Sequence, residues 1–315
     1  MKILIAALVA AALGFWIAPA GAQEKVIVGH SARAALSIGP LLYGIERGFY
    51  RNEGIDLLYV SLRADLGIKA LLAGEIDYSY SVGTIIRGAV LGLPVRNLSF
   101  DFSRVLHALM SRPEIPTAAA LRGKTVGVSS FGATGDLAAR FGLRSLGLDP
   151  EKDVTIITLG TDTLRYAALL AGTVQATHMP VPLNIQLKKK GYHELVYAGN
   201  ILQRPLTGLA TSMERIQKKP DQVQRMVRAF VRSTRALKSE RAGFIAFAQR
   251  KYGYSKEVLE EAYKYLADAI AQDGFVDDGA LQAAIDEAKT LAKVTKAINP
   301  SDIVDYSFLR AAVKK

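Results

Sequence analysis

The sequence of 315 residues contains no cysteine. Disulfide bonds, thiolate zinc sites, iron–sulfur clusters and cysteine nucleophiles are therefore excluded. Histidine is also scarce, because the chain has only His30, His107, His178 and His193, and none of their spacings matches a helical metal-binding motif. We expect no metal site, no other cofactor and no catalytic residues.

The chain has one long hydrophobic run, which lies at its start. Lys2 precedes the apolar residues Ile3–Ile17, and Ala20-Gly21-Ala22 offers a small-x-small cleavage pattern. The run is shorter than the ~20 residues that a membrane-spanning helix needs. We therefore predict a signal peptide over residues 1–22 and export to the periplasm. No cysteine follows the run, so we expect no lipid anchor.

The net charge of +11 comes from 40 Lys and Arg residues against 29 Asp and Glu residues. These basic residues are spread along the chain, with Lys188-Lys189-Lys190 as the longest cluster. The sequence has no zinc finger, no aromatic-rich RNA-binding motif and no long basic arm. We interpret the charge as a solvated basic surface and expect no nucleic-acid partner.

Short β-branched runs alternate with amphipathic helical patterns between residues 26 and 197. Ile55–Val60 is typical of a strand, and Asp136–Leu146 is typical of a helix. Such alternation predicts an α/β fold with βαβ units and a largely parallel sheet. After Met213 the pattern predicts only helices, one of them N-capped by Ser255.

One eight-residue word occurs twice in this series. Ala70–Asp77 reads ALLAGEID, and Ala168–Gln175 reads ALLAGTVQ. Each copy combines the end of an amphipathic helix, a glycine stop and the start of a strand. The repetition predicts two lobes of related construction, although both words are built from common residues.

Several segments together resemble the solute-binding proteins of bacterial ABC importers. They are Gly48–Asp56, the word at Ala70–Asp77, Leu121–Ser130, Gly147–Val154 and the tail Asp305–Leu309. Their order and spacing are similar to the branch that includes nitrate, taurine, alkanesulfonate and thiamine-precursor binders. The resemblance covers nearly the whole chain after the predicted signal peptide.

The resemblance implies a two-lobed periplasmic-binding-protein fold of type II with two crossover strands and a helical C-terminal segment. Lobe 1 would comprise residues 23–109 and 212–315, and lobe 2 would comprise residues 110–211. The helical C-terminal third would pack largely on lobe 1.

In open parallel sheets, ligands bind where loops follow the carboxyl ends of strands. Four such loops begin near His30, Ser81, Ser129 and Met179. The candidate ligand-binding residues in these loops are Ser31, Arg33, Ser81, Thr84, Ser130, Gly132, Ala133, Thr134, Met179 and Pro180.

The loop that leads into the Asp136–Leu146 helix is the most informative of the four. Its small residues allow close backbone approach, and the N–H groups at a helix start suit an anion. Thr134 also fits a plain helix cap. Asp136 argues against an anion, because a carboxylate in the first turn already occupies the positive end of the helix dipole.

Arg33 and Arg87 are the arginines nearest to these loops and are able to pair with an acid group, although a solvated surface position is the alternative for each. His30 and His178 end strands of opposite lobes, so both are expected to face the cleft.

The resemblance implies that the protein captures a small polar or anionic organic solute by clamshell closure and delivers it to an inner-membrane ABC permease complex. We expect a monomer without enzymatic activity. A ligand-sensing module for a signalling receptor and an enzyme built on the same fold are the alternatives. The sequence leaves the identity of the ligand open.

Overall fold

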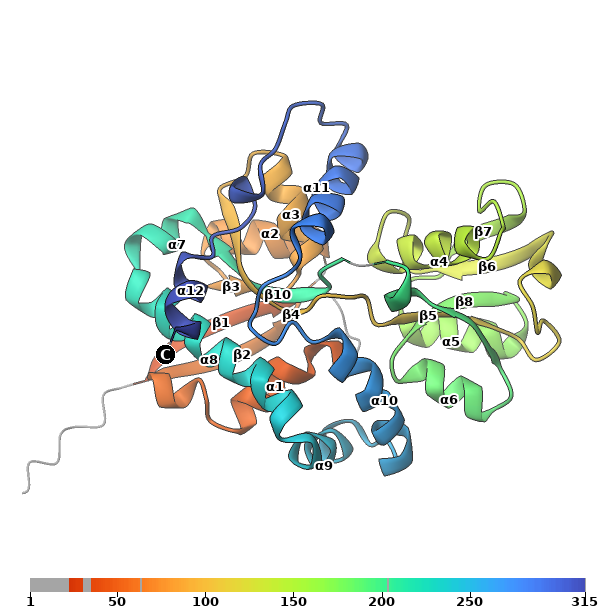
Figure 1. The fold of residues 1–315 in the computed structure, drawn as a ribbon, viewed down its shortest axis with the longest axis horizontal. Coiled ribbons are helices and arrows are strands. Elements are labelled where there is room, and N and C mark those ends of the chain that lie inside the picture. Colours follow the sequence, from red (N-terminus) through yellow and green to blue (C-terminus); the bar gives the residue numbers. More distant parts are fainter. Residues whose placement is uncertain (1–22, 31–34, 63, 203, 315) are drawn as a thin grey trace, which may run out of the picture.

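The computed structural model describes residues 23–30, 35–62, 64–202 and 204–314, and the expected signal peptide lies outside them. The described chain forms two five-stranded sheets, each flanked by helices, which lie side by side (Figure 1). Sheet A has the order β2-β1-β3-β10-β4, with β1 (Glu24–His30), β2 (Ile55–Ser61), β3 (Tyr78–Ser79), β4 (Val95–Phe102) and β10 (Thr207–Ser212). Sheet B has the order β7-β6-β8-β5-β9, with β5 (His107–Ser111), β6 (Lys124–Val128), β7 (Val154–Thr158), β8 (Ala176–Pro180) and β9 (His193–Tyr197). We call sheet A with its helices lobe 1 and sheet B with its helices lobe 2.

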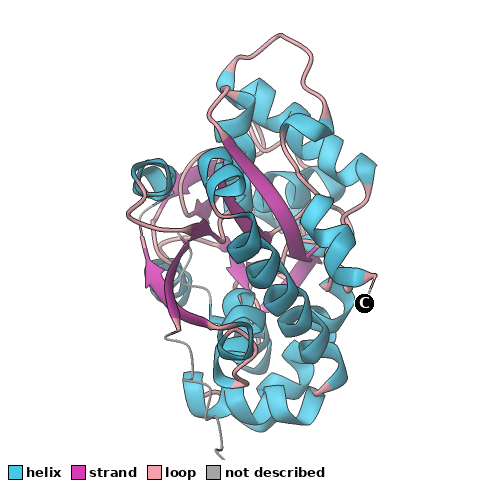
Figure 2. Cartoon of the chain, turned by 90° about the vertical axis from the view of Figure 1, so that its left-hand side faces the viewer, coloured by secondary structure: helices cyan, strands magenta, loops and turns pink. Residues whose placement is uncertain are grey.

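Lobe 1 carries most of the helices, and they enclose its strands in the end-on view of Figure 2. Its helices are α1 (Gly39–Glu46), α2 (Ala64–Ala73), α3 (Val82–Val90), α7 (Met213–Lys218), α8 (Pro220–Ser239), α9 (Arg241–Tyr252), α11 (Asp278–Ala292) and α12 (Ser307–Val313). Lobe 2 carries α4 (Thr134–Ser145), α5 (Asp162–Ala171) and α6 (Leu183–Lys189). The remaining helix, α10 (Lys256–Ala269), begins after Ser255, whose hydroxyl accepts a hydrogen bond from Val258 N as predicted.

The prediction of a largely parallel sheet is wrong for β5 and β10. β1 is parallel to β2 and β3, and β6 is parallel to β7 and β8. In contrast, β10 is antiparallel to β3 and β4, and β5 is antiparallel to β8 and β9. Each of these two strands enters its sheet directly from the other lobe. A parallel strand needs a longer crossover, usually a helix, before it.

The repeated word occupies the same place in both lobes. In lobe 1, Ile27 N donates to the Asp77 carboxylate at 2.7 Å, and Asp77 N donates to Ile27 O. In lobe 2, Thr125 N donates to the Gln175 amide oxygen at 3.1 Å, and Gln175 N donates to Thr125 O. The two sheets also match strand by strand in their order. The predicted related construction of the two lobes is confirmed.

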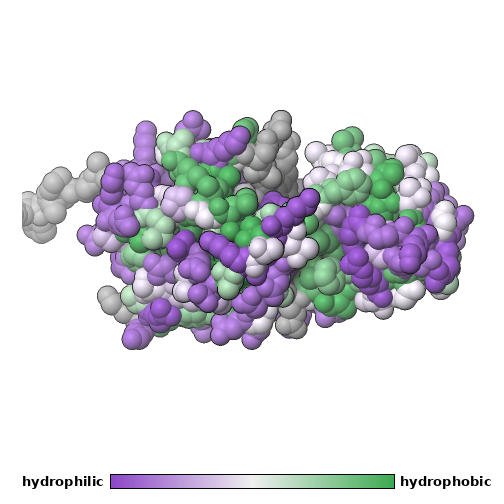
Figure 3. Space-filling model, turned by 90° about the horizontal axis from the view of Figure 1, so that it is seen from above, coloured by the Kyte–Doolittle hydropathy of each residue, from purple (hydrophilic) through white to green (hydrophobic). Residues whose placement is uncertain are grey.

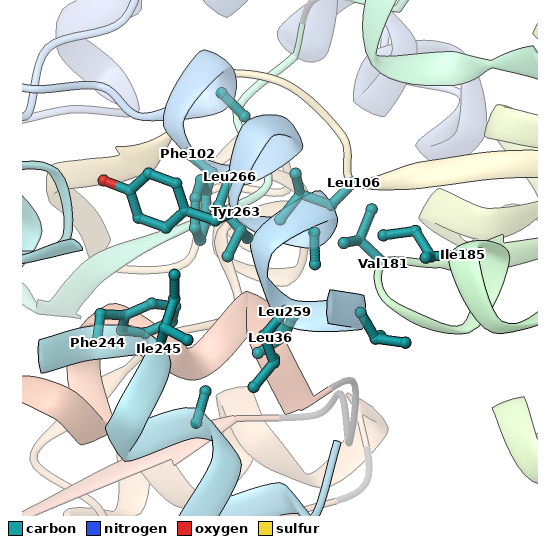
Figure 4. Packing of buried hydrophobic residues seen from close by; sticks show 14 of the residues in the cluster. Leu36, Phe102, Leu106, Val181, Ile185, Phe244, Ile245, Leu259, Tyr263 and Leu266 are labelled. Carbon is teal, nitrogen blue, oxygen red and sulfur yellow. The ribbon is translucent and has the colours of Figure 1, made fainter. Parts of the chain in front are cut away.

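Helix α10 packs against both lobes. A buried hydrophobic cluster joins Leu259 and Leu266 of α10 and Phe102 of lobe 1 to Val181 and Ile185 of lobe 2 (Figure 4). We call it the interlobe cluster.

Polar contacts continue this junction at the surface. Lys188 Nζ of α6 lies 3.1 Å from Glu261 Oε1 of α10, and Tyr265 OH donates to Glu194 of β9 at 3.4 Å. The two lobes are therefore joined by a packed helix as well as by the chain segments between their sheets.

Hydrophobic side chains also reach the surface of both lobes, between larger polar areas (Figure 3). None of the described helices combines the length and the apolar character that crossing a membrane requires.

Candidate functional site

A cavity of about 610 Å³ lies between the two lobes. Its wall includes the carboxyl ends of β1 and β2 and the first turn of α3 from lobe 1. Lobe 2 contributes the loops that follow β6, β7 and β8. The volume lies in the range of about 300–1,000 Å³ that is usual for organic ligands. The arrangement is that of a ligand cleft at the carboxyl ends of parallel strands.

Most of the predicted site residues line this cavity. They are Ser81, Thr84, Ser130, Gly132, Ala133, Thr134 and Pro180. Ser31 and Arg33 lie outside the described residues.

Met179 does not line the cavity. Its side chain is fully buried and packs in the interlobe cluster. Successive side chains of a strand point to opposite faces, so His178 and Pro180 on β8 reach the cavity while Met179 faces the core.

Three histidines line the cavity, His30 from lobe 1 and His107 and His178 from lobe 2. His30 Nδ1 lies 3.0 Å from Ser81 Oγ, and the His107 and His178 ring centroids are 5.3 Å apart. Among the described residues, no hydrogen-bond partner meets His30 Nε2, His107 Nδ1 or either ring nitrogen of His178. His30 and His178 were expected at the cleft from their strand-end positions, and both are there. His107 was not expected.

Burial keeps these imidazoles neutral. It lowers the pKa of His30 to about 3 and that of His107 to about 4. The pKa of His178 also falls well below its ordinary value, mainly through burial and further through the nearby Arg165 and His107. A neutral imidazole has one donor and one acceptor nitrogen. The cavity wall therefore carries hydrogen-bonding groups without a formal charge.

Gly135 explains why the His178 ring lies against the first turn of α4. A Cβ atom at position 135 would lie only 2.0 Å from Cε1 of His178. Any side chain larger than hydrogen would push the imidazole away from this turn. The small residues of this loop thus make room for the His178 ring. The sequence had suggested that they make room for a ligand.

The Asp136 carboxylate does not occupy the anion position at the start of α4 that the sequence had suggested for it. Its carboxylate is buried and accepts hydrogen bonds from Gly132 N and Arg140 Nε, each at 2.8 Å. It is not part of the cavity wall. The carboxylate is turned back onto its own loop and paired with a cation, so it is not an argument against an anion in the cavity.

The charged groups of the wall are mostly paired. Arg165 forms an ion pair with Asp162, and Arg204 Nη1 lies 2.6 Å from Glu287 Oε2. Arg87 lines the cavity, is half-buried and makes no ion pair with a described residue. The sequence left open whether Arg87 faces the cleft or the solvated surface, and in the structure it lines the cavity.

Besides His107, sequence reasoning missed two parts of the wall. The loop Gly160–Asp162 follows β7 and opens α5, so the rule that identified the other loops applies to it as well. Glu287 of α11 and Arg204 had no such signal, because their pairing joins residues 83 positions apart.

The described residues contain no group of three His, Asp or Glu side chains placed to hold a metal ion. Hydrogen bonding, ion pairing and apolar contact are the interactions that these wall residues offer.

Comparisons with known proteins agree with this geometry. A family model described as the NMT1-like family matches residues 22–249. No curated protein matches the chain. Among solved structures, the periplasmic aliphatic sulphonate binding protein SsuA from Escherichia coli is similar, with a TM-score of 0.71 and 16% identity over 90% of this chain and 92% of that one. The periplasmic nitrate-binding protein NrtA from Synechocystis PCC 6803 has a TM-score of 0.72 and 13% identity over 92% of this chain and 88% of that one.

A structure named as an enzyme is also similar. The desulfurization enzyme DSZB has a TM-score of 0.67 and 16% identity, and the match covers 93% of this chain and 99% of that one. At such identities the likeness shows a shared fold, here the two-lobed α/β architecture of the periplasmic binding proteins.

Proposed function

Because the chain belongs to the NMT1-like family, we propose that it is the solute-binding protein of an ABC importer. It captures a small polar or anionic organic solute outside the inner membrane and delivers it to the permease complex. The names of the structural neighbours support this proposal, since two of them are periplasmic binding proteins for small anions. The predicted signal peptide supports export to the periplasm.

The observation that carries the proposal is the position of the cavity between the lobes. Ser81 and Thr84 of lobe 1 face it together with Ser130 and Thr134 of lobe 2. A solute that contacts both walls gains its full binding energy only when the lobes are closed. Such a solute shifts the equilibrium between open and closed forms toward the closed form.

The hinge of this motion lies in the two segments that join the sheets. One connects β4 to β5, and the other connects β9 to β10. We propose that lobes 1 and 2 move as two bodies about these segments. The permease would then distinguish the closed outer surface from the open one.

An enzymatic function is the second candidate, because DSZB has the same fold and the cavity holds three neutral imidazoles. A general base is usually oriented by a partner such as a carboxylate. Among the described residues, no carboxylate accepts a hydrogen bond from a cavity imidazole. We therefore propose binding without catalysis.

Native mass spectrometry of the protein tests this function. The full chain is expressed with its N-terminal segment, recovered from the periplasm and kept folded throughout. We expect a small molecule to leave with the protein and to be recovered chemically unchanged after release. Recovery of an altered molecule contradicts the proposal and favours the enzyme.

A double variant tests the site itself. Ser81→Ala with Thr134→Ala removes a hydroxyl from each wall and is expected to weaken binding of the recovered molecule by roughly 1–3 kcal/mol, because buried polar groups of the solute lose their partners. Calorimetry measures the change, and Ser239→Ala on the exposed face of α8 is the control. Unchanged affinity in the double variant rejects the assignment of these loops.

A further inference from the structure

We propose that the cargo is an organic monoanion with an apolar body, and that the Arg87 guanidinium binds its acid group beside the first turn of α3. This inference rests on the proposed solute-binding function and names the class of solute. It is carried by the charges, the unpartnered polar groups and the apolar side chains of the cavity wall.

The charge balance of the wall favours one negative group. Its described residues include three guanidinium groups, those of Arg87, Arg165 and Arg204, and two carboxylates, those of Asp162 and Glu287. Each carboxylate is paired with an arginine, which leaves Arg87 as the cation without a partner among the described residues. A guanidinium binds a carboxylate or sulfonate through two parallel hydrogen bonds. A cationic solute would meet no unpaired carboxylate on the described wall.

The position of Arg87 on α3 places it where an anion is further stabilised. Gly83 and Thr84 lie one helical turn before Arg87 and line the same cavity. Side chains of a helix point back toward its N-terminus, so the Arg87 guanidinium extends toward this first turn. Arg204 Nη2 is also close, at 3.4 Å from the position of a Cβ on Gly83. The positive end of the α3 dipole adds to both guanidinium charges.

A second observation that favours a polar solute is the set of unpartnered ring nitrogens in the cavity wall. His178 is 2% exposed and His30 is 5% exposed, and both ring nitrogens of His178 and Nε2 of His30 have no partner among the described residues. Leaving a buried polar group unsatisfied costs about 1–3 kcal/mol. These nitrogens are closed to solvent in this form of the protein, so we expect a solute to pair with them only after the wall rearranges around it.

The rest of the wall requires an organic body. Leu62, Val82 and Ile86 line the cavity from lobe 1, and Leu106, Val181 and Leu206 line it from the interlobe side. Leu62 and Leu206 are partly exposed, whereas the other four side chains are at most 1% exposed and form the apolar backing of the wall. An inorganic oxyanion would leave Leu62, Leu206 and most of the 610 Å³ without contact. Burial of apolar surface contributes about 25 cal/mol per Å², so an apolar body adds substantially to affinity.

The experiment compares five probes that share a body or a charge. Hexanesulfonate and hexanoate carry the proposed acid group on a hydrocarbon chain. Hexanamide has a neutral amide in place of the acid group, and hexylammonium has a cation there. Nitrate has the negative charge without the hydrocarbon chain. Thermal shift and calorimetry measure the binding of each probe, at millimolar concentration, to the purified full-length protein. We expect both organic anions to bind and the other three probes to bind much more weakly.

Variants of Arg87 test its role directly. Arg87→Gln is expected to weaken binding of hexanesulfonate roughly 10- to 100-fold, because a hydrogen bond between charged groups is lost. Arg87→Lys keeps the positive charge but lacks the two parallel N–H donors of the guanidinium, so this variant should retain part of the affinity. Arg144→Gln is the matched control, since Arg144 also lies in the last turn of its helix but outside the cavity wall. Circular dichroism confirms that each variant is folded.

The outcomes separate this inference from the proposed function. Equal affinity of Arg87→Gln and the parent for hexanesulfonate overturns the role of Arg87. Binding of hexanamide or hexylammonium as tight as that of the anions overturns the solute class, as does binding of nitrate alone. Absence of binding by every probe also overturns the inference. In each case the native mass spectrometry of the recovered cargo still decides whether the protein is a solute-binding protein.

Discussion

Asp101 is a fully buried carboxyl group behind the part of the cavity wall that belongs to lobe 1. Tyr80 OH and Thr207 Oγ1 donate hydrogen bonds to it, the latter at 2.6 Å. Burial raises the pKa of Asp101 from 3.8 to about 7, although the hydrogen bond from Thr207 opposes the shift. Thr207 itself lines the cavity, so this buried acid supports a part of the cavity wall from behind.

The raised pKa of Asp101 makes stability depend on pH with a definite sign. The folded protein holds this proton more tightly than the unfolded chain does, so the contribution is full below pH 3.8 and is lost as pH rises to about 7. Asp101→Asn removes this dependence. Between these limits we expect the free energy of unfolding of the variant, relative to that of the parent, to rise by about 1.4 kcal/mol for each pH unit. Urea unfolding at several pH values measures it, and a constant difference would contradict the buried-acid assignment.

Gly135 offers a second prediction for a single residue. Gly135→Ala brings a methyl group into the His178 ring, and overpacking of this kind typically costs about 1–3 kcal/mol. We expect a lower free energy of unfolding together with weaker binding of the recovered cargo. Parent-like stability and affinity would show that His178 does not lie against this turn.

At the scale of the element, the repeated helix–glycine–strand word is the best example of what local sequence determines. Gly74 and Gly172 follow α2 and α5 with φ angles of 75° and 79°. This left-handed conformation ends the helix and releases the chain into the next strand, and it costs a non-glycine residue about 1–2 kcal/mol. The word predicts the same turn twice because the turn depends on a few neighbouring residues.

Two glycines near the same helix make a matched pair for this argument. Among the described residues, a Cβ at Gly74 or at Gly67 within α2 meets no atom within 4 Å, so we expect packing to contribute little at either position. Gly74→Ala is expected to lower the free energy of unfolding by about 1 kcal/mol through backbone strain. Gly67→Ala is expected to raise it by up to about 1 kcal/mol, because alanine has the higher helix propensity. Thermal and urea unfolding measure both, and a change of the same sign in the two variants would contradict the account.

The strands β5 and β10 show where element prediction fails. The resemblance implied two crossover strands between the lobes, but the expectation of a largely parallel sheet did not include their antiparallel direction. Their direction follows from the lobe that the chain leaves just before them. A short window of sequence contains no information on that point.

At the scale of the whole molecule, the lobes are joined by two chain segments and by α10. The interlobe cluster and the Lys188–Glu261 pair lie on the α10 side of this junction. When the two lobes rotate about the connecting segments to close the cavity, α10 therefore has to slide or tilt against lobe 2. This helix belongs to the part of the chain that was expected to pack largely on lobe 1.

Cargo binding should change both the shape and the stability of the molecule. We expect the radius of gyration from small-angle X-ray scattering to fall when the recovered cargo is added. Ligand at 100 times its Kd should also raise the free energy of unfolding by about 2.7 kcal/mol. Arg87→Gln should reduce both effects at the same cargo concentration, whereas Arg144→Gln should not. An unchanged radius with saturating cargo would contradict closure.

The sequence by itself determined the alternation of strands and helices, the repeated turn, the exclusion of cysteine chemistry and the loops that reach the cavity through Ser81, Ser130 and Thr134. These features depend on residues close in the chain, where hydrophobic period and turn chemistry are decisive. The tertiary structure decided the direction of β5 and β10, the burial of Met179, the pairing of Arg204 with Glu287 and the place of α10. Each of these depends on contacts between distant segments, and such contacts form only when both lobes pack.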